Sequence, residues 1–185
     1  KSAETLFDLY FKSVGRGASL LLNLPPDRRG RIHENDEKAL RQFKSMLDET
    51  FATNFAREGE ASASHVRGNA SRYGAANAID DDNESYWTTD DHVTAAALTV
   101  ELKTPQEIDC VMLQEHIALG QRVEAFALEA WNNNEWQIIA EGTSIGHKRL
   151  LRFPSMQTSK VRLNIAQASA CPLISNFGLY KITQQ

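Results

Sequence analysis

The sequence predicts a mainly β protein, an antiparallel β-sandwich or jelly roll that follows a helix–strand–helix segment. The basis is a change of pattern near residue 55. Upstream, apolar residues recur at helical spacing on either side of one continuous apolar run. Downstream, short runs alternate between apolar and polar residues and are separated by turn-forming residues. We therefore divide the chain into residues 1–54 and residues 55–185.

Two helices are expected in the first part. Residues 4–14 place their apolar side chains on one face and are followed by Gly15, which is typical of a helix C-terminus. A second helical pattern follows Asn35 or Asp36, either of which can cap it, and continues to Phe51.

The run Leu20–Leu24 between these helices does not alternate, which is typical of a strand buried on both faces of a parallel sheet. Gly17 precedes it, and Pro25 and Pro26 end it. Burying its leucines is worth ~2 kcal/mol for each side chain, but the chain supplies no parallel partner strand. We expect the segment to be the end of a longer α/β protein that continues upstream.

Six short runs predict the strands of the sandwich, and about 130 residues suffice for an independent core. They cover residues 98–102, 126–130, 136–140, 148–153, 161–165 and 177–182. Turn signals separate them, among them Pro154–Ser155.

Charge and composition exclude several kinds of partner. The formal net charge is -4, which argues against nucleic acid and anionic membranes. No apolar run approaches the ~20 residues that span a bilayer. The two cysteines, Cys110 and Cys171, define no disulfide framework, and a buried thiol is the expectation for Cys110.

Two resemblances to known families appear in the residues. The segment 13–30 (SVGRGASLLLNLPPDRRG), followed by IHEND, resembles the closing strand and loop of α-L-fucosidase catalytic barrels. The second part resembles the coagulation-factor type C, or discoidin-like, galactose-binding fold. That resemblance is carried by residues 78–87 (AIDDDNESYW), 115–123 (EHIALGQRV) and 174–180 (ISNFGLY). Some fucosidases carry both pieces in this order.

The first resemblance implies a periplasmic or extracellular parent enzyme with a (β/α)8 barrel, which removes terminal α-L-fucose from glycans with retention of configuration. Such chemistry needs two carboxyl groups ~5 Å apart. No stretch here matches the family's nucleophile motif, so we assign no catalytic residue. Asn23, Asp27 and Arg28 would lie on the active-site side of the parent barrel. The alternative is that they only tie down its last loop.

The second resemblance implies binding of fucosylated or galactose-containing glycans, although discoidin-like modules also bind lipids or proteins. Arg67, His92 and Arg122 are candidate polar contacts to a sugar, and Trp131 is the candidate exposed ring. The other two tryptophans are expected in the core. Glu115 and Arg122, at the two ends of one loop, are expected to pin that loop or to dock it on the parent barrel.

The acidic run 80–85 (DDDNES) predicts either a structural Ca²⁺ site or a plain acidic turn. Its candidate ligands are Asp80, Asp82, Asn83, Ser85 and, near the final strand, Asn176. The resemblance implies a glutamate at that last place in sugar-binding relatives. An EF-hand is excluded because its sixth position would be Ser85 instead of glycine. No cofactor is required otherwise.

The alternative to a fucosidase part is a stand-alone discoidin-like binding module without catalysis. The segment Leu20–Gly30 argues against it, because a free-standing module has no use for a strand buried on both faces. Without the parent barrel, residues 1–54 are expected to pack against the sandwich or against a second copy of the chain.

Overall fold

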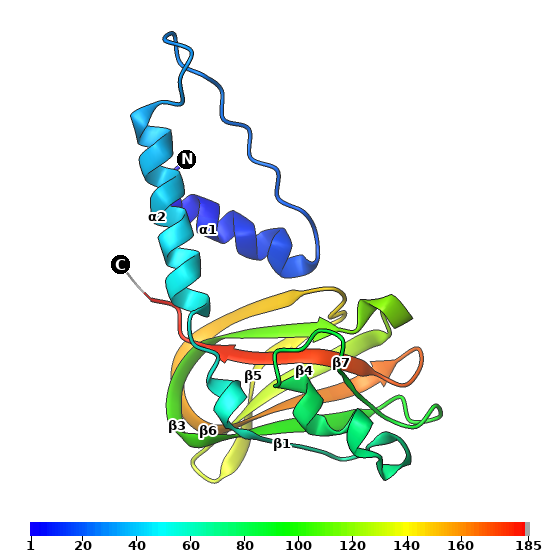
Figure 1. Ribbon diagram of the computed structural model, residues 1–185. Coiled ribbons are helices and arrows are strands. Elements are labelled where there is room, and N and C mark those ends of the chain that lie inside the picture. The colour runs from blue at the N-terminus through cyan, green and yellow to red at the C-terminus, as the bar shows by residue number, and fades with distance from the viewer. Residues whose placement is uncertain (184–185) are drawn as a thin grey trace.

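The protein consists of a helical N-terminal part beside a β-sandwich, described by a computed structural model over residues 1–183 (Figure 1). The helices are α1 (Ala3–Lys12) and α2 (Glu34–Phe51); the strands are β1 (Glu60–Ala63), β2 (Trp87–Thr88), β3 (Ala96–Glu115), β4 (Val123–Asn132), β5 (Glu135–Gly142), β6 (Arg149–Ala168) and β7 (Leu173–Tyr180). Short 3₁₀ helices cover Val14–Arg16, Phe55–Glu58, Arg67–Asn69, Ser71–Tyr73, Ala75–Ala78 and Ile117–Leu119. Within residues 1–183, no helix is long and apolar enough to cross a membrane.

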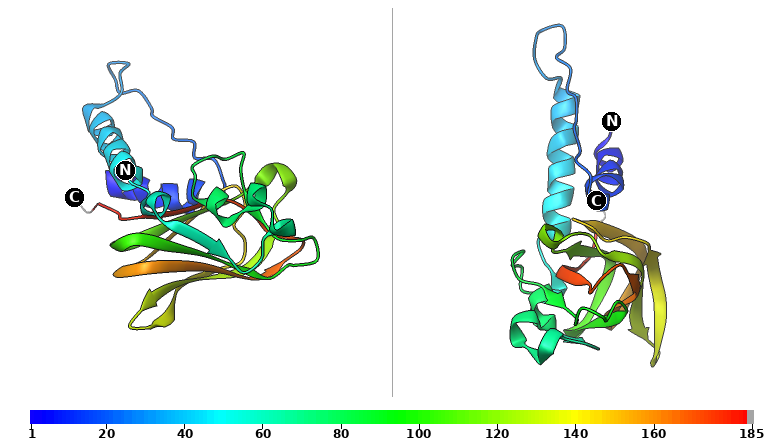
Figure 2. Two further views of the ribbon diagram at one scale, coloured as in Figure 1. Left: turned by 60° about the horizontal axis from the view of Figure 1, so that its bottom comes forward. Right: turned by 90° about the vertical axis from the view of Figure 1, so that its right-hand side faces the viewer.

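All strand pairs are antiparallel, and the sheet order is β2-β7-β3-β6-β4-β5, with β1 pairing β3. The strands β3 and β6 have 20 residues each and pair from Ala96↔Ile165 to Leu113↔Arg149. Irregularities in their register allow the pair to bend. One half of β3 pairs with β7 and the other with β1. The two long strands therefore run through both layers, and the sheet curls around one core (Figure 2).

Alternating apolar residues fill this core. Leu98 on β3 faces Leu163 on β6, which in turn faces Leu128 on β4, and all three side chains are fully buried. Trp87 is also fully buried, and its indole Nε1 donates to the carbonyl of His65 at 2.8 Å. The predicted fold class, mostly antiparallel β structure preceded by helices, is confirmed.

One predicted break between strands is absent. The runs 148–153 and 161–165 belong to the single strand β6, which continues through Pro154. Opposite this residue the β3–β6 register shifts between Ile108 and Cys110. A proline is tolerated at such a bulge because no ladder hydrogen bond from its nitrogen is needed there.

The two helices dock on the outer face of the sandwich. Phe11 of α1 packs in a cluster with Phe43 of α2 and with Leu150 and Tyr180 of the sheet. The ring of Phe51 meets that of Tyr180 edge-on, with 5.1 Å between ring centroids. The N-terminal part thus finds its main cover on the sandwich, one of the two arrangements expected from the sequence.

The helix boundaries differ slightly from the prediction. The helix α2 begins at Glu34, and His33 is its N-cap, with Nδ1 accepting from the backbone N–H of Asn35 at 3.1 Å. The expected caps, Asn35 and Asp36, lie inside the first turn. Imidazole is an uncommon cap, so the usual preference for Asn and Asp placed the start of the helix two or three residues too far along.

The strand predicted for Leu20–Leu24 is absent as a hydrogen-bonded element. Residues 18–27 have no assigned helix or strand and form part of the long connection that stands away from the sandwich in Figure 1. Leu21 is 95% exposed, whereas Leu22 packs against the helix cluster. Among the described residues, no strand lies beside this segment to take its backbone hydrogen bonds.

A pH-dependent contact fastens α1 to the sheet. Asp8 accepts from Lys12 of α1 and from Arg152 of β6, each at 2.6 Å, and these bonds hold the pKa of Asp8 below its ordinary value. A lowered pKa contributes stability that is present above the unfolded-state pKa and is lost as the pH falls through the folded-state value. We predict that Asp8→Asn lowers the melting temperature at pH 7 and that this difference shrinks and disappears as the pH falls below the ordinary aspartate pKa and through the lowered pKa of Asp8.

The control is Asp48→Asn, because Asp48 pairs with Lys44 within α2. It should change the melting temperature less at pH 7. Equal effects of the two substitutions would contradict a special role for Asp8.

The exposure of Leu21 predicts self-association through the connecting segment, since unpaired extended backbone with apolar side chains promotes aggregation. Light scattering over a concentration series should show association of the chain and its reduction by Leu21→Asp. Ala18→Asp, which adds the same charge at an exposed residue nearby, is the control. A chain that stays monomeric at all concentrations would contradict this prediction.

Candidate functional site

A small pocket of about 130 Å³ opens at one end of the sandwich. The loops around β2 and those that join β3 to β4 and β6 to β7 supply its walls. Its lining residues are Arg67, Tyr73, Tyr86, Thr88, Asp91, Leu119, Arg122, Cys171 and Leu173. Two of the four predicted sugar contacts, Arg67 and Arg122, therefore meet in one pocket.

The guanidinium of Arg122 contacts neutral acceptors. Its Nη1 donates to the backbone carbonyl of Cys171 at 2.9 Å and lies 2.8 Å from the Sγ of the same residue. Its Nη2 donates to the carbonyl of Leu119 at 3.2 Å. Among the described residues, no carboxylate forms an ion pair with this guanidinium.

Arg67 reaches the same thiol from the other side. Its Nε donates to the carbonyl of Thr89 at 3.2 Å, and its Nη2 lies 3.9 Å from the Sγ of Cys171. The same Nη2 forms an ion pair with Asp91, whose side chain is 86% exposed. Two guanidiniums thus converge on one pocket that contains a single carboxylate.

Glu115 holds the loop that carries Arg122. Its carboxylate is 2% exposed, and Oε1 accepts from the backbone N–H groups of Arg122 at 2.7 Å and Val123 at 3.0 Å. Oε2 accepts from the N–H of Gly146 at 2.6 Å. Such charge-assisted bonds offset the cost of burying the carboxylate. Glu115 pins the loop, as expected, but it does so through backbone groups and not through an ion pair with Arg122.

Aromatic rings form one wall of the pocket. The rings of Tyr73 and Tyr86 are 5.8 Å apart, and Tyr86 stacks on His116 with 4.6 Å between centroids. Sequence reasoning missed both tyrosines. Alternation could have found Tyr86, because it precedes the buried Trp87 and must point to the opposite side.

The other two sugar candidates lie elsewhere. His92 is exposed in the turn after β2 and does not line the pocket. Trp131 lies at the far end of β4 from Arg122, roughly 30 Å along the strand. There it is half-buried and meets Trp136 edge-on at 5.3 Å between centroids.

The expectation that Trp136 packs in the core is wrong, whereas that for Trp87 is confirmed. Trp136 lies on the edge strand β5, opposite Trp131, and the guanidinium of Arg162 sits 4.3 Å from its ring centroid. An edge strand has a solvent-facing side, and aromatic and cationic side chains can cover each other there.

The acidic loop is organised by its own hydrogen bonds. Asp80 accepts from the N–H of Asp82 at 2.8 Å and from the Ser85 hydroxyl at 2.7 Å. Asp82 accepts from the N–H of Glu84 at 2.9 Å. The backbone carbonyl of Asn83 faces the Nδ1 of His116 at 3.1 Å. This pattern is that of an acidic turn.

Asn176 is the candidate ligand with a buried, unused oxygen. It is 6% exposed, and its Oδ1 has no hydrogen-bond partner. Within residues 1–183, however, no three His, Cys, Asp or Glu side chains gather in a way that could hold a metal ion. Ca²⁺ also takes backbone and amide oxygens as ligands, so the Ca²⁺ site stays a prediction.

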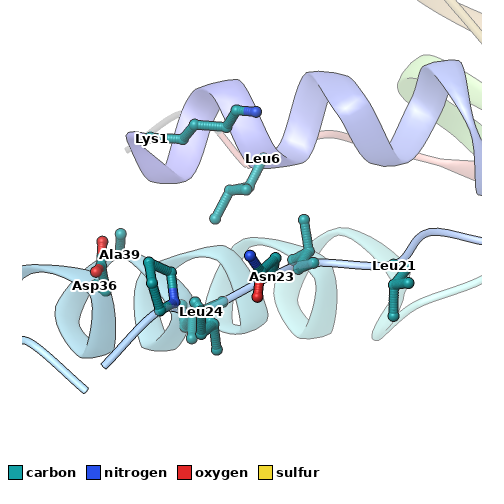
Figure 3. Close-up of a pocket in the computed structure, with 10 residues that line it drawn as sticks. Lys1, Leu6, Leu21, Asn23, Leu24, Asp36 and Ala39 are labelled. Atoms are coloured by element: carbon teal, nitrogen blue, oxygen red, sulfur yellow. The ribbon is translucent and has the colours of Figure 1, made fainter. Parts of the chain in front are cut away.

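The N-terminal candidates are not brought together. Asn23 lines an apolar groove of about 470 Å³ between α1, the connecting segment and α2 (Figure 3). Asp27 instead closes its own turn by accepting from the side chain and backbone of Arg29. This pairing with Arg29 lowers the pKa of Asp27. Arg28 is exposed.

Both cysteines are free and buried. Burial raises the pKa of the Cys110 thiol well above its ordinary value, so this thiol is unreactive. Cys110 lies under the helices, whereas Cys171 lies in the arginine pocket.

Comparison with known proteins identifies the family of the sandwich. The model of the F5/8 type C domain family matches residues 60–177, which is most of the sandwich. The chain belongs to this family. The sandwich also shares its fold, at 18% identity and a TM-score of 0.62, with a chitosan-binding module from Paenibacillus sp. IK-5; the match covers 69% of this chain and 97% of that module.

The similarity to α-L-fucosidases extends beyond the family domain. The chain is 36% identical to alpha-L-fucosidase 1 of Arabidopsis thaliana over 184 residues, covering 97% of this chain and 36% of that protein. It superposes on a GH29 fucosidase of Ruminococcus gnavus in complex with fucose with a TM-score of 0.93 and 33% identity. That match covers 100% of this chain and 37% of the other. The chain thus spans about a third of the length of the curated plant relatives it matches.

The acidic loop provides a test of metal dependence. We predict that Asp80→Ala removes two loop hydrogen bonds and destabilises the sandwich by about 1–2 kcal/mol. The loss should be the same in Ca²⁺ and in a chelator, because the loop is held by its own groups.

Chemical unfolding of both proteins, with and without Ca²⁺, measures this. A wild-type chain that is stabilised by Ca²⁺, with Asp80→Ala insensitive to it, would instead show a bound cation, because a ligand of the native state raises stability.

Proposed function

We propose that this chain is the C-terminal part of an exo-α-L-fucosidase, in which the β-sandwich binds glycans beside a catalytic barrel supplied upstream. The observation that carries this proposal is the extent of the similarity. It includes residues 1–54, which lie outside the matched F5/8 type C domain and which an independent sandwich does not need.

The N-terminal part supports the proposal physically. Its extended segment carries an almost fully exposed Leu21 and unpaired backbone groups. Beside it runs a groove lined by apolar side chains of α1 and α2 (Figure 3). Neighbouring strands and helices of a barrel would cover both features. On this proposal Asn23, Asp27 and Arg28 lie on the active-site side of that barrel.

Hydrolysis with retention requires a nucleophile and an acid/base, both carboxyl groups. The arginine pocket contains one carboxylate, Asp91, and it is engaged by Arg67. We therefore assign binding to the pocket and hydrolysis to the upstream barrel. Glycan hydrolysis also favours a periplasmic or extracellular location for the parent enzyme.

In glycan binding the pocket residues have distinct parts. Tyr73 and Tyr86 offer ring surface against which a sugar can pack, and the guanidiniums of Arg67 and Arg122 can donate to its oxygens. Glu115 does not contact the sugar itself but positions Arg122, because it accepts a hydrogen bond from the backbone N–H of that residue.

Release of fucose from an aryl α-L-fucoside tests the assignment of catalysis. We predict no turnover by the chain alone, above a mock preparation, and turnover by the protein encoded when the reading frame is extended upstream of Lys1.

Two outcomes would contradict the proposal. Turnover by the chain alone would place catalysis within it. An extended protein that encodes no barrel and releases no fucose would favour the alternative, a binding module of the F5/8 type C family without catalysis.

A further inference from the structure

The arginine pocket carries more positive charge than a neutral sugar requires. We propose that it binds the anionic terminal residue of a glycan, a sugar that bears a carboxylate or sulfate group. The proposal deepens the glycan-binding function proposed above and rests on it.

The first argument is the state of Arg122. A guanidinium has five N–H donors. That of Arg122 contacts two backbone carbonyls and one thiol. Arg122 is only partly buried, and no described carboxylate pairs with its guanidinium. Its charge is therefore available to an anion that enters the pocket.

The second argument is the charge balance around the pocket. Asp91 is the only acidic residue in the lining, and it already pairs with Arg67. Its neighbour Asp90 accepts from the backbone N–H of Gly68. Glu115 is buried behind the loop, where three backbone N–H groups satisfy it. The lining therefore has one cation in excess.

The cations beyond the lining do not reverse this balance. The guanidinium of Arg72 lies 4.5 Å from the ring centroid of Tyr73, and His116 stacks on Tyr86. Both groups add positive or neutral character next to the aromatic wall. Among the lining residues, Asp91 supplies the one carboxylate that an entering anion meets.

The third argument is size. A volume of about 130 Å³ lies below the range of ~300–1,000 Å³ typical of ligand sites, so the pocket takes one terminal residue instead of a chain segment. A planar carboxylate or a sulfate can face the paired guanidiniums, which donate in a fork geometry suited to such groups. The ring of the same sugar can then lie against Tyr73 or Tyr86.

Calorimetric titration of the chain with three glycans of one backbone tests this: lactose, lactose 3′-sulfate and 3′-sialyllactose. We expect at least one acidic glycan to bind about tenfold or more tightly than lactose, because hydrogen bonds between a guanidinium and an anionic group are stronger than those to a neutral hydroxyl. Comparison of lactose 3′-sulfate with 3′-sialyllactose shows whether the pocket prefers a sulfate or a carboxylate. Raising the salt concentration should weaken acidic binding and leave lactose binding unchanged.

Variants locate the site. Arg67→Gln and Arg122→Gln should each reduce acidic binding to the level of lactose, with melting curves confirming the fold. Asp91→Asn, at an exposed position, should strengthen acidic binding. Arg162→Gln is the control, because Arg162 pairs with Glu129 far from the pocket.

The outcomes separate the two proposals. Equal affinity for acidic and neutral glycans would overturn the anionic preference and leave glycan binding in place. Acidic binding that survives both pocket arginine variants and ignores Asp91→Asn would overturn this site. Binding of none of the three glycans would overturn the anionic proposal for these groups and weaken the glycan-binding role of the sandwich itself.

Discussion

The buried carboxylate of Glu115 is the constraint on which the pocket end of the sandwich depends. Its three short bonds join the end of β3, the start of β4 and the loop before β6. A charged group held away from water requires all of its partners at once, because one lost partner leaves an unsatisfied buried charge. These three segments are therefore fixed relative to one another, and Arg122, the last residue before β4, is presented to the pocket in one position.

The residues that face the pocket come from segments far apart in sequence, and this separation explains how much the sequence could predict. Short runs between turn signals located every strand of the sandwich except β1 and β2, which are four and two residues long. Such runs could not show that Arg67 and Arg122 meet at one thiol, because that depends on how loops approach each other. Trp136 was expected in the core because tryptophan is usually buried, but that preference carries no information on which strand is at the edge. Tyr73 lies in a 3₁₀ turn with no period to reveal its direction.

The N-terminal part illustrates a different limit. The leucine run predicts a strand buried on both faces, and this prediction is wrong for this chain, because residues 18–27 form no strand and Leu21 is exposed. An apolar run indicates that a segment is suited to burial in a sheet. Whether it forms a strand depends on a neighbouring strand, and none lies beside it in the described part of this chain. The helices did find such partners, because Phe11, Phe43 and Phe51 meet Leu150 and Tyr180 on the sandwich. The same reasoning from apolar periodicity thus succeeded for α1 and α2 and failed for the strand between them.

The length of β3 and β6 has a consequence for how the sandwich comes apart and forms. Two separate sheets could part along their apolar interface, each keeping its own hydrogen bonds. Here the same two backbones run through both layers, and β3 pairs with β1, β6 and β7. Opening one layer therefore disturbs the ladder of the other, and the layers behave as one cooperative unit. These pairings also join residues distant in sequence, such as Ala96 and Ile165, so loop closure precedes most of the native contacts and slows folding.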